Sequence, residues 1–216
     1  MKKIFLFTFC LSIIALAGTA QQKDQKAQQI LDGVSSRYKA YKSVQADFNI
    51  KVEGGTNSST KEQQTGTLYL KGNKYKLKIN NQEIISDNTT VWTYLKDANE
   101  VQINAFETDD NSISPTEIFT IYEKNFLYAF VEEKTVGGKS LQIIDLTPND
   151  KNKPYFKVRL AIDKAAKAIQ SAIVFDKNGN RYTYEIIKLT PNPEIAETFF
   201  SFDTNKYPGI EVVDLR

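Results

Sequence analysis

Short runs of alternating apolar and polar residues, about a dozen along the chain, constrain its fold more than any other feature. Val44, Ala46, Phe48, Ile50 and Val52 alternate with mostly polar neighbours, which is the pattern of a strand with one buried face. Similar runs cover 65–71, 74–80, 83–87, 90–95, 101–104, 126–134, 140–146, 156–162, 169–176 and 181–189, with one more expected near Phe199. The chain is therefore predicted to be mainly β.

Turn-forming dipeptides separate several of these runs, namely Gly72-Asn73, Asn80-Asn81, Gly137-Gly138 and Asn178-Gly179. Glycine and asparagine adopt the positive φ angles that tight hairpins require, so we expect neighbouring strands to pair antiparallel. A single antiparallel sheet with this many strands has to curl.

Two segments have helical patterns. Apolar residues recur every three or four positions between Ala27 and Tyr41, which predicts a helix over 24–42. A second helix is expected to begin at Pro115, because Ser114 and Glu117 are spaced as a capping box. We therefore predict a mainly β fold with some α: an incomplete, half-open antiparallel β-barrel that is covered by a lid of short helices.

The N-terminus resembles an export signal. Lys2 and Lys3 precede an apolar run, 4–17, that is too short to span a bilayer, and small residues end it at Ala20. We expect residues 1–20 to be a cleavable signal peptide and residues 21–216 to form one domain. Cys10 follows bulky residues, which does not suit acylation, so the mature chain is expected to be periplasmic, without an anchor and without cysteine.

Composition excludes several classes of function. The chain has 28 Lys+Arg and 26 Asp+Glu, and removal of Lys2 and Lys3 leaves a neutral mature protein, which argues against a nucleic-acid partner. The chain contains no histidine, so Ser-His-Asp catalysis and most zinc sites lack their usual member. The adjacent carboxylates Asp109 and Asp110 are more typical of a solvated loop than of a catalytic pair. We expect no catalytic residue, no metal site and no cofactor.

The segment Ser86-Asp87-Asn88-Thr89-Thr90-Val91-Trp92-Thr93-Tyr94 resembles the "SDGKTLW.Y" hairpin of the LolA family, the periplasmic carriers of outer-membrane lipoproteins. Residues 30–36 resemble the first helix of that family, residues 45–48 its "ASF" strand and residues 66–71 its "GxLWVK" strand. Residues 115–119 occupy the place of its second lid helix. One departure is clear: better-known members have Arg-Pro where this chain has Gly72-Asn73, so the arginine that helps to hold their lid shut is missing.

The resemblance implies a monomeric carrier that moves lipoproteins between the two membranes. Its partners would be acylated lipoproteins, an inner-membrane lipoprotein-releasing ABC transporter and an outer-membrane acceptor. Each buried CH₂ contributes about 0.8 kcal/mol, so a carrier of acyl chains needs a large apolar surface. The residues expected to bind acyl chains are Leu31, Val34, Phe48, Ile50, Leu77, Ile79, Ile84, Trp92, Ile118, Phe119 and Ile121.

Three alternatives remain open from the sequence. The same apolar residues are also those of an ordinary filled core, and Trp92 would then suit the outer face of the sheet. The carrier would alternatively take another lipid or a hydrophobic metabolite. A domain of this fold would also serve as an envelope sensor that detects lipoproteins without transporting them.

Overall fold

The computed structural model describes residues 24–54, 61–107, 116, 120–123 and 125–216. One long helix, α1 (Gln25–Lys39), precedes a single sheet, and short 3-10 turns interrupt the chain at η1 (Ile121–Glu123), η2 (Glu197–Phe200) and η3 (Thr204–Lys206). The strands are β1 (Val44–Glu53), β2 (Lys61–Lys71), β3 (Lys74–Ile79), β4 (Gln82–Ser86), β5 (Thr90–Leu95), β6 (Glu100–Ala105), β7 (Phe126–Val136), β8 (Lys139–Pro148), β9 (Tyr155–Asp163), β10 (Ala168–Asp176), β11 (Arg181–Pro191) and β12 (Glu211–Asp214). Among these residues, no helix has the length and apolar character needed to cross a membrane.

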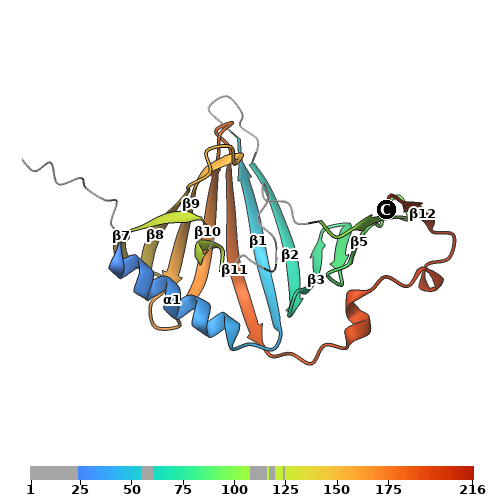
Figure 1. Cartoon of the computed structure of the whole chain (residues 1–216), viewed down its shortest axis with the longest axis horizontal. Helices are drawn as coiled ribbons and strands as arrows, with labels where there is room; N and C mark the ends of the chain where they lie inside the picture. Colours follow the sequence, from blue (N-terminus) through green and yellow to red (C-terminus); the bar gives the residue numbers. More distant parts are fainter. Residues whose placement is uncertain (1–23, 55–60, 108–115, 117–119, 124) are drawn as a thin grey trace, which may run out of the picture.

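All twelve strands that the structure describes belong to one sheet, in the order β12-β6-β5-β4-β3-β2-β1-β11-β10-β9-β8-β7. The sheet is not closed: β12 and β7 form its two edges (Figure 1). The hairpins predicted from turn residues are confirmed, since Gly72, Asn80, Gly137, Gly138 and Gly179 all have positive φ. The mainly β fold and the unclosed sheet therefore agree with the sequence analysis, whereas the predicted lid of short helices corresponds, among the described residues, to the single helix α1 and 3-10 turns.

Two expectations about strands are wrong. β12 pairs with β6 in parallel, so the sheet is mixed, although every other neighbouring pair that the structure describes is antiparallel. The segment near Phe199 is not a strand but the 3-10 turn η2, because its aromatic side chains pack against the sheet and do not join its ladder. The second predicted helix, from Pro115, and the signal peptide, 1–20, lie outside the described residues.

Helix α1 covers one face of the sheet, which we call the inner face, and crosses it from β7 towards β10 (Figure 1). Asp24 caps the helix by accepting a hydrogen bond from the Ala27 amide at 3.0 Å. The same carboxylate accepts a bond from the Phe130 amide of β7 at 2.8 Å. These two bonds fix the start of α1 to an edge strand, and the apolar stripe of the helix is buried on the sheet.

Residues 192–210, which we call the strap, run from β11 to β12 (Figure 1) and pack on the opposite, outer face, where Phe199 contacts Tyr69 and the strap lies beside Ile85. Its Phe200 is completely buried, and Phe202 and Tyr207 pack against Tyr94 with ring centroids 5.2 and 4.8 Å away. Lys71 and Lys74 hold the strap through Glu197 at 2.7 and 2.8 Å. The molecule therefore has apolar cores on both faces of its sheet.

Candidate functional site

A cavity of about 250 Å³ lies on the inner face. Strand pairing explains how it is built, because directly opposed residues point to the same face of a sheet. Ile50, Tyr184, Ala172 and Leu160 form one such row across β1, β11, β10 and β9. A second row of this kind crosses β3, β2, β1 and β11 and consists of Ile79, Gly66, Phe48 and Ile186. The cavity is lined by Ala46, Phe48, Ile50, Leu68, Leu77, Ile79, Ile121, Val158, Leu160, Ile169, Ala172, Val174, Tyr184 and Ile186.

The lining is apolar apart from one hydroxyl. Among the described residues at the wall, only Tyr184 carries a polar side-chain atom. Burial raises the pKa of Tyr184, and the neighbouring Tyr182 adds to the effect, so its hydroxyl stays protonated at neutral pH. Elsewhere the described side chains contain no group of three His, Cys, Asp or Glu residues that is suited to a metal ion. The site is therefore able to bind hydrocarbon, with one hydrogen-bonding group in its wall.

The eleven residues expected to bind acyl chains fall into four groups. Phe48, Ile50, Leu77, Ile79 and Ile121 line the cavity. Leu31, Val34 and Ile84 do not line it but pack in the core on the same face. Ile118 and Phe119 lie outside the described residues.

Trp92 is the fourth case, because the strand register places it on the outer face. It pairs with Ile85 of β4 and Ile103 of β6, whereas Ile84, which faces inward, pairs with Thr93. Trp92 therefore occupies the outer face, as in the alternative position considered in the sequence analysis.

Nine lining residues were not expected from the sequence: Ala46, Leu68, Val158, Leu160, Ile169, Ala172, Val174, Tyr184 and Ile186. Most belong to β9, β10 and β11, whose alternating patterns are visible in the sequence. Their place at the cavity depends on β11 pairing with β1, a contact between residues more than 120 positions apart. Alternation reveals that a residue is buried, but it does not reveal which distant strand it faces.

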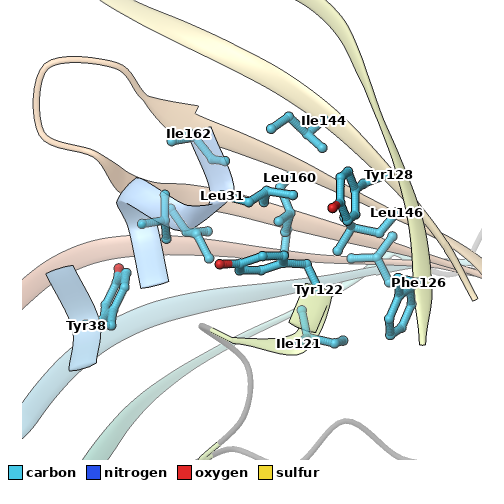
Figure 2. Close-up of a cluster of buried hydrophobic side chains, with 14 of the residues drawn as sticks. Leu31, Tyr38, Ile121, Tyr122, Phe126, Tyr128, Ile144, Leu146, Leu160 and Ile162 are labelled. Atoms are coloured by element: carbon cyan, nitrogen blue, oxygen red, sulfur yellow. The ribbon is translucent and has the colours of Figure 1, made fainter. Parts of the chain in front are cut away.

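Beside the cavity, the core under α1 is filled. Figure 2 shows Leu31 of α1, Tyr122 of η1 and Leu160 of β9 close together, and Ile144 and Leu146 of β8 belong to the same buried cluster. Leu31 and Val34 are each only 1% exposed. The cavity therefore continues a packed core, and Ile121 stands at the boundary between the two.

Polar contacts connect η1 to α1 at this boundary. Glu123 accepts a hydrogen bond from Ser35 at 2.5 Å and an ion-paired bond from Lys39 at 2.6 Å. The Tyr122 hydroxyl donates to Asp32 at 3.1 Å. The Lys39 and Ser35 bonds lower the pKa of Glu123, so it is ionised at neutral pH. We call these contacts the latch, because they hold Ile121 against the cavity.

Comparisons with known proteins agree with this architecture. The family model described as outer membrane lipoprotein carrier protein LolA matches residues 39–203. No curated protein matches the chain in sequence. A crystal structure of an uncharacterized conserved protein from Thermus thermophilus has a TM-score of 0.58 at 13% identity, over 88% of this chain and 99% of that one.

Two further solved structures have lower scores. Lipoprotein LppX of Mycobacterium tuberculosis has a TM-score of 0.51 at 11% identity, over 80% of this chain and 98% of that one. A LolA superfamily protein from Nitrosomonas europaea has a TM-score of 0.46 at 13% identity, over 82% and 98% of the two chains. At these sequence identities, the Thermus thermophilus and Mycobacterium tuberculosis structures establish similarity of fold alone.

Proposed function

The chain belongs to the LolA family, and we propose that it is a periplasmic carrier that binds the acyl chains of lipoproteins in its inner-face cavity. The family is one of carriers, not of enzymes, and its members are typically periplasmic. The observation that carries the proposal is the cavity wall, which is hydrocarbon except for Tyr184. On this proposal residues 1–20 are removed on export, and residues 21–216 are the mature, monomeric carrier.

The volume of the cavity sets a requirement for this function. A methylene group is about as large as a water molecule, whose share of the liquid is about 30 Å³, so 250 Å³ accommodates about eight methylenes. Their burial would contribute about 6 kcal/mol, and a lipoprotein with several long chains needs more room. The cavity must therefore widen for a complete cargo, and η1 and α1 would act as the lid that moves away.

A cavity that is narrower when it is empty also favours release. Separation of α1 from the sheet exposes Leu31 and Val34, which are buried in the empty protein. That cost is subtracted from the free energy of cargo binding, so affinity remains moderate. Transfer to an outer-membrane acceptor, after loading from an inner-membrane ABC transporter, requires such moderate affinity.

The experiment that tests the proposal uses a fluorescent fatty-acyl probe and triacylated peptide as the competitor. The chain from Gln21 onward should bind the probe, and the peptide should displace it. Leu77→Glu and Ile79→Glu should weaken binding at least tenfold, because each places a carboxylate in an apolar wall. Ile187→Glu is the matched control, since Ile187 is 62% exposed and does not line the cavity.

Two results would contradict the proposal: a wild-type chain that ignores the probe, and cavity variants whose loss of binding merely follows their loss of folded protein. The volume also favours a second candidate, a carrier of one smaller lipid or hydrophobic metabolite. Displacement by free fatty acid but not by triacylated peptide would establish that candidate instead.

A further inference from the structure

One end of the sheet combines exposed aromatic and basic side chains. There β9 and β11 begin and β10 ends, at the upper end of the molecule in Figure 1. Residues 149–157 and 175–181 make up this end, which we call the basic tip. Phe156 is 50% exposed, although a phenyl ring is normally buried, and its neighbour Pro154 is exposed as well.

Basic side chains surround this apolar group. Lys151, Lys177 and Arg181 are exposed, and Lys153 and Lys157 are half-buried. Phe175 lies 6.1 Å from Phe156 between ring centroids, and the Lys157 ammonium lies 4.4 Å from the centre of the Phe175 ring. The Arg181 guanidinium lies 5.7 Å from the same ring. Two cations of the tip therefore lie over the same aromatic ring.

Three of the four acidic residues nearby accept hydrogen bonds or ion pairs within the fold. Asp150 accepts a bond from the Asn152 amide, and Asp176 accepts bonds from Asn180, so both stabilise turns. Asp145 is paired with Arg159 at 2.6 Å, and Lys157 reaches it at 3.7 Å. Glu53 of β1 lies opposite Arg181 of β11. The five basic residues of the tip together with Arg159 outnumber these four acidic residues, so this end of the molecule has a net positive charge. Residues 21–216 as a whole have a net charge of zero.

We propose that the basic tip docks on an anionic phospholipid surface, with Phe156 in the headgroup region and the lysines on lipid phosphates. Aromatic side chains flanked by lysine and arginine suit the membrane interface, where apolar acyl chains lie directly beside hydrated, charged headgroups. The headgroup region of an anionic bilayer supplies phosphates for the cations and, directly beneath them, an acyl boundary for the ring of Phe156.

The position of the tip gives docking a consequence for the proposed carrier function, and this step rests on that function. Val158 and Val174 are cross-strand partners that line the cavity, and each is next to a tip residue, Lys157 or Phe175. A docked tip would therefore hold one end of the cavity close to the bilayer. Acyl chains would then have a short path between lipid and carrier.

Vesicle binding tests the inference with the chain from Gln21 onward, which contains every described element and lacks the apolar run at 4–17. Vesicles of phosphatidylglycerol and phosphatidylcholine should bind the chain, and vesicles of phosphatidylcholine alone should bind it at least tenfold more weakly. Each lysine near an anionic surface contributes about fivefold, so Lys151→Gln with Lys153→Gln should lower partitioning about 25-fold. Phe156→Ser should lower it further, and salt should weaken binding of the wild type.

The matched control is Ile187→Ser with Lys188→Gln, which removes an exposed apolar side chain and a cation from the other end of β11. The control should bind within twofold of the wild type. Equal binding to both kinds of vesicle, or equal losses in tip and control variants, would overturn the inference. Retention on an acidic polypeptide without binding to vesicles would also overturn it and would indicate a protein partner.

The Leu77→Glu variant distinguishes membrane docking by the tip from acyl-chain binding in the cavity. If the tip docks, this cavity variant should bind anionic vesicles as the wild type does, even when it no longer binds the acyl probe. Loss of vesicle binding in Leu77→Glu would mean that lipid enters the cavity and that the tip is not the contact. Failure of the wild type to bind the probe, with vesicle binding intact, would overturn the proposed function alone.

Discussion

At the scale of single residues, Gly66 controls the shape of the cavity wall. It lies between Ile79 and Phe48 in one cross-strand row, and the Phe48 ring crosses above it. A Cβ at this position would stand 2.6 Å from Phe48 Cζ and 2.8 Å from the Lys78 carbonyl oxygen. The absence of a side chain at position 66 therefore allows Phe48 to lie flat against the sheet and leaves the cavity open.

We predict that Gly66→Ala lowers the free energy of unfolding by about 1–3 kcal/mol, because the ring and the strand must both move. The displaced Phe48 ring should also weaken binding of the acyl probe. Urea unfolding and probe titration measure the two effects.

Gly33→Ala in α1 is the control, because its Cβ would meet only Lys167 Cδ, at an ordinary 3.6 Å. That change should raise stability by up to about 1 kcal/mol through helix propensity. A Gly66→Ala protein as stable as the wild type would show that the close contacts relax without cost.

At the scale of elements, the latch between α1 and η1 takes the place of the family's missing lid arginine in our proposal. Its ion pair is partly solvated, with Glu123 36% and Lys39 58% exposed, so the pair contributes at most about 1 kcal/mol. We predict that Glu123→Gln accelerates uptake of the acyl probe by up to about fivefold, with little change in melting temperature. Stopped-flow fluorescence measures the uptake rate.

Glu133→Gln provides the control for the latch. Glu133 of β7 forms a similar ion pair with Lys164 at 2.8 Å, but the bonds that it accepts come from Lys164 and Ser140, which belong neither to α1 nor to η1. Its uptake rate should equal that of the wild type. Equal acceleration in both variants would mean that general loosening, and not the latch, limits uptake.

The latch should also respond to acid. The pKa of Glu123 lies below its ordinary value of 4.5 in the folded protein, so the latch is complete above pH 4.5 and weakens as pH falls through the lowered pKa. Wild-type uptake should therefore accelerate below about pH 4.5, the reference pKa of the side chain. The Glu123→Gln protein should lack this component, and an identical pH profile in both proteins would exclude Glu123 as its source.

At the scale of the whole molecule, an unclosed sheet with a partly empty core should be stabilised by its cargo. A ligand at 100 times its dissociation constant adds about 2.7 kcal/mol to the stability of the folded state. For a chain of this length, each kcal/mol raises the melting temperature by about 2–4 °C, so a saturating acyl ligand should raise it by roughly 5–10 °C. Differential scanning calorimetry measures the shift.

Ile79→Glu should show at most about half of this shift when the same ligand is added, because its carboxylate in the apolar wall weakens binding at least tenfold. A shift as large as that of the wild type would place the ligand outside the cavity.

The sequence by itself determined the local structure. Alternation predicted eleven of the twelve strands with their ends within a few residues, and the apolar stripe predicted α1, because both patterns reflect which side of an element is buried. It missed β12, whose four residues, Glu211–Asp214, are too few to show a clear period. It also assigned a strand near Phe199, because aromatic residues are common in strands and equally common in a packed turn.

Only the tertiary structure decided which apolar residues share a cavity. Phe48 and Trp92 both lie in alternating strands, yet the register of the sheet sends Phe48 to the inner face and Trp92 to the outer face. Likewise, the pairing of β1 with β11 brings Ile50 and Tyr184 together from distant parts of the chain. A period of two identifies a strand's buried side, but the face of the common sheet to which that side belongs depends on long-range pairing.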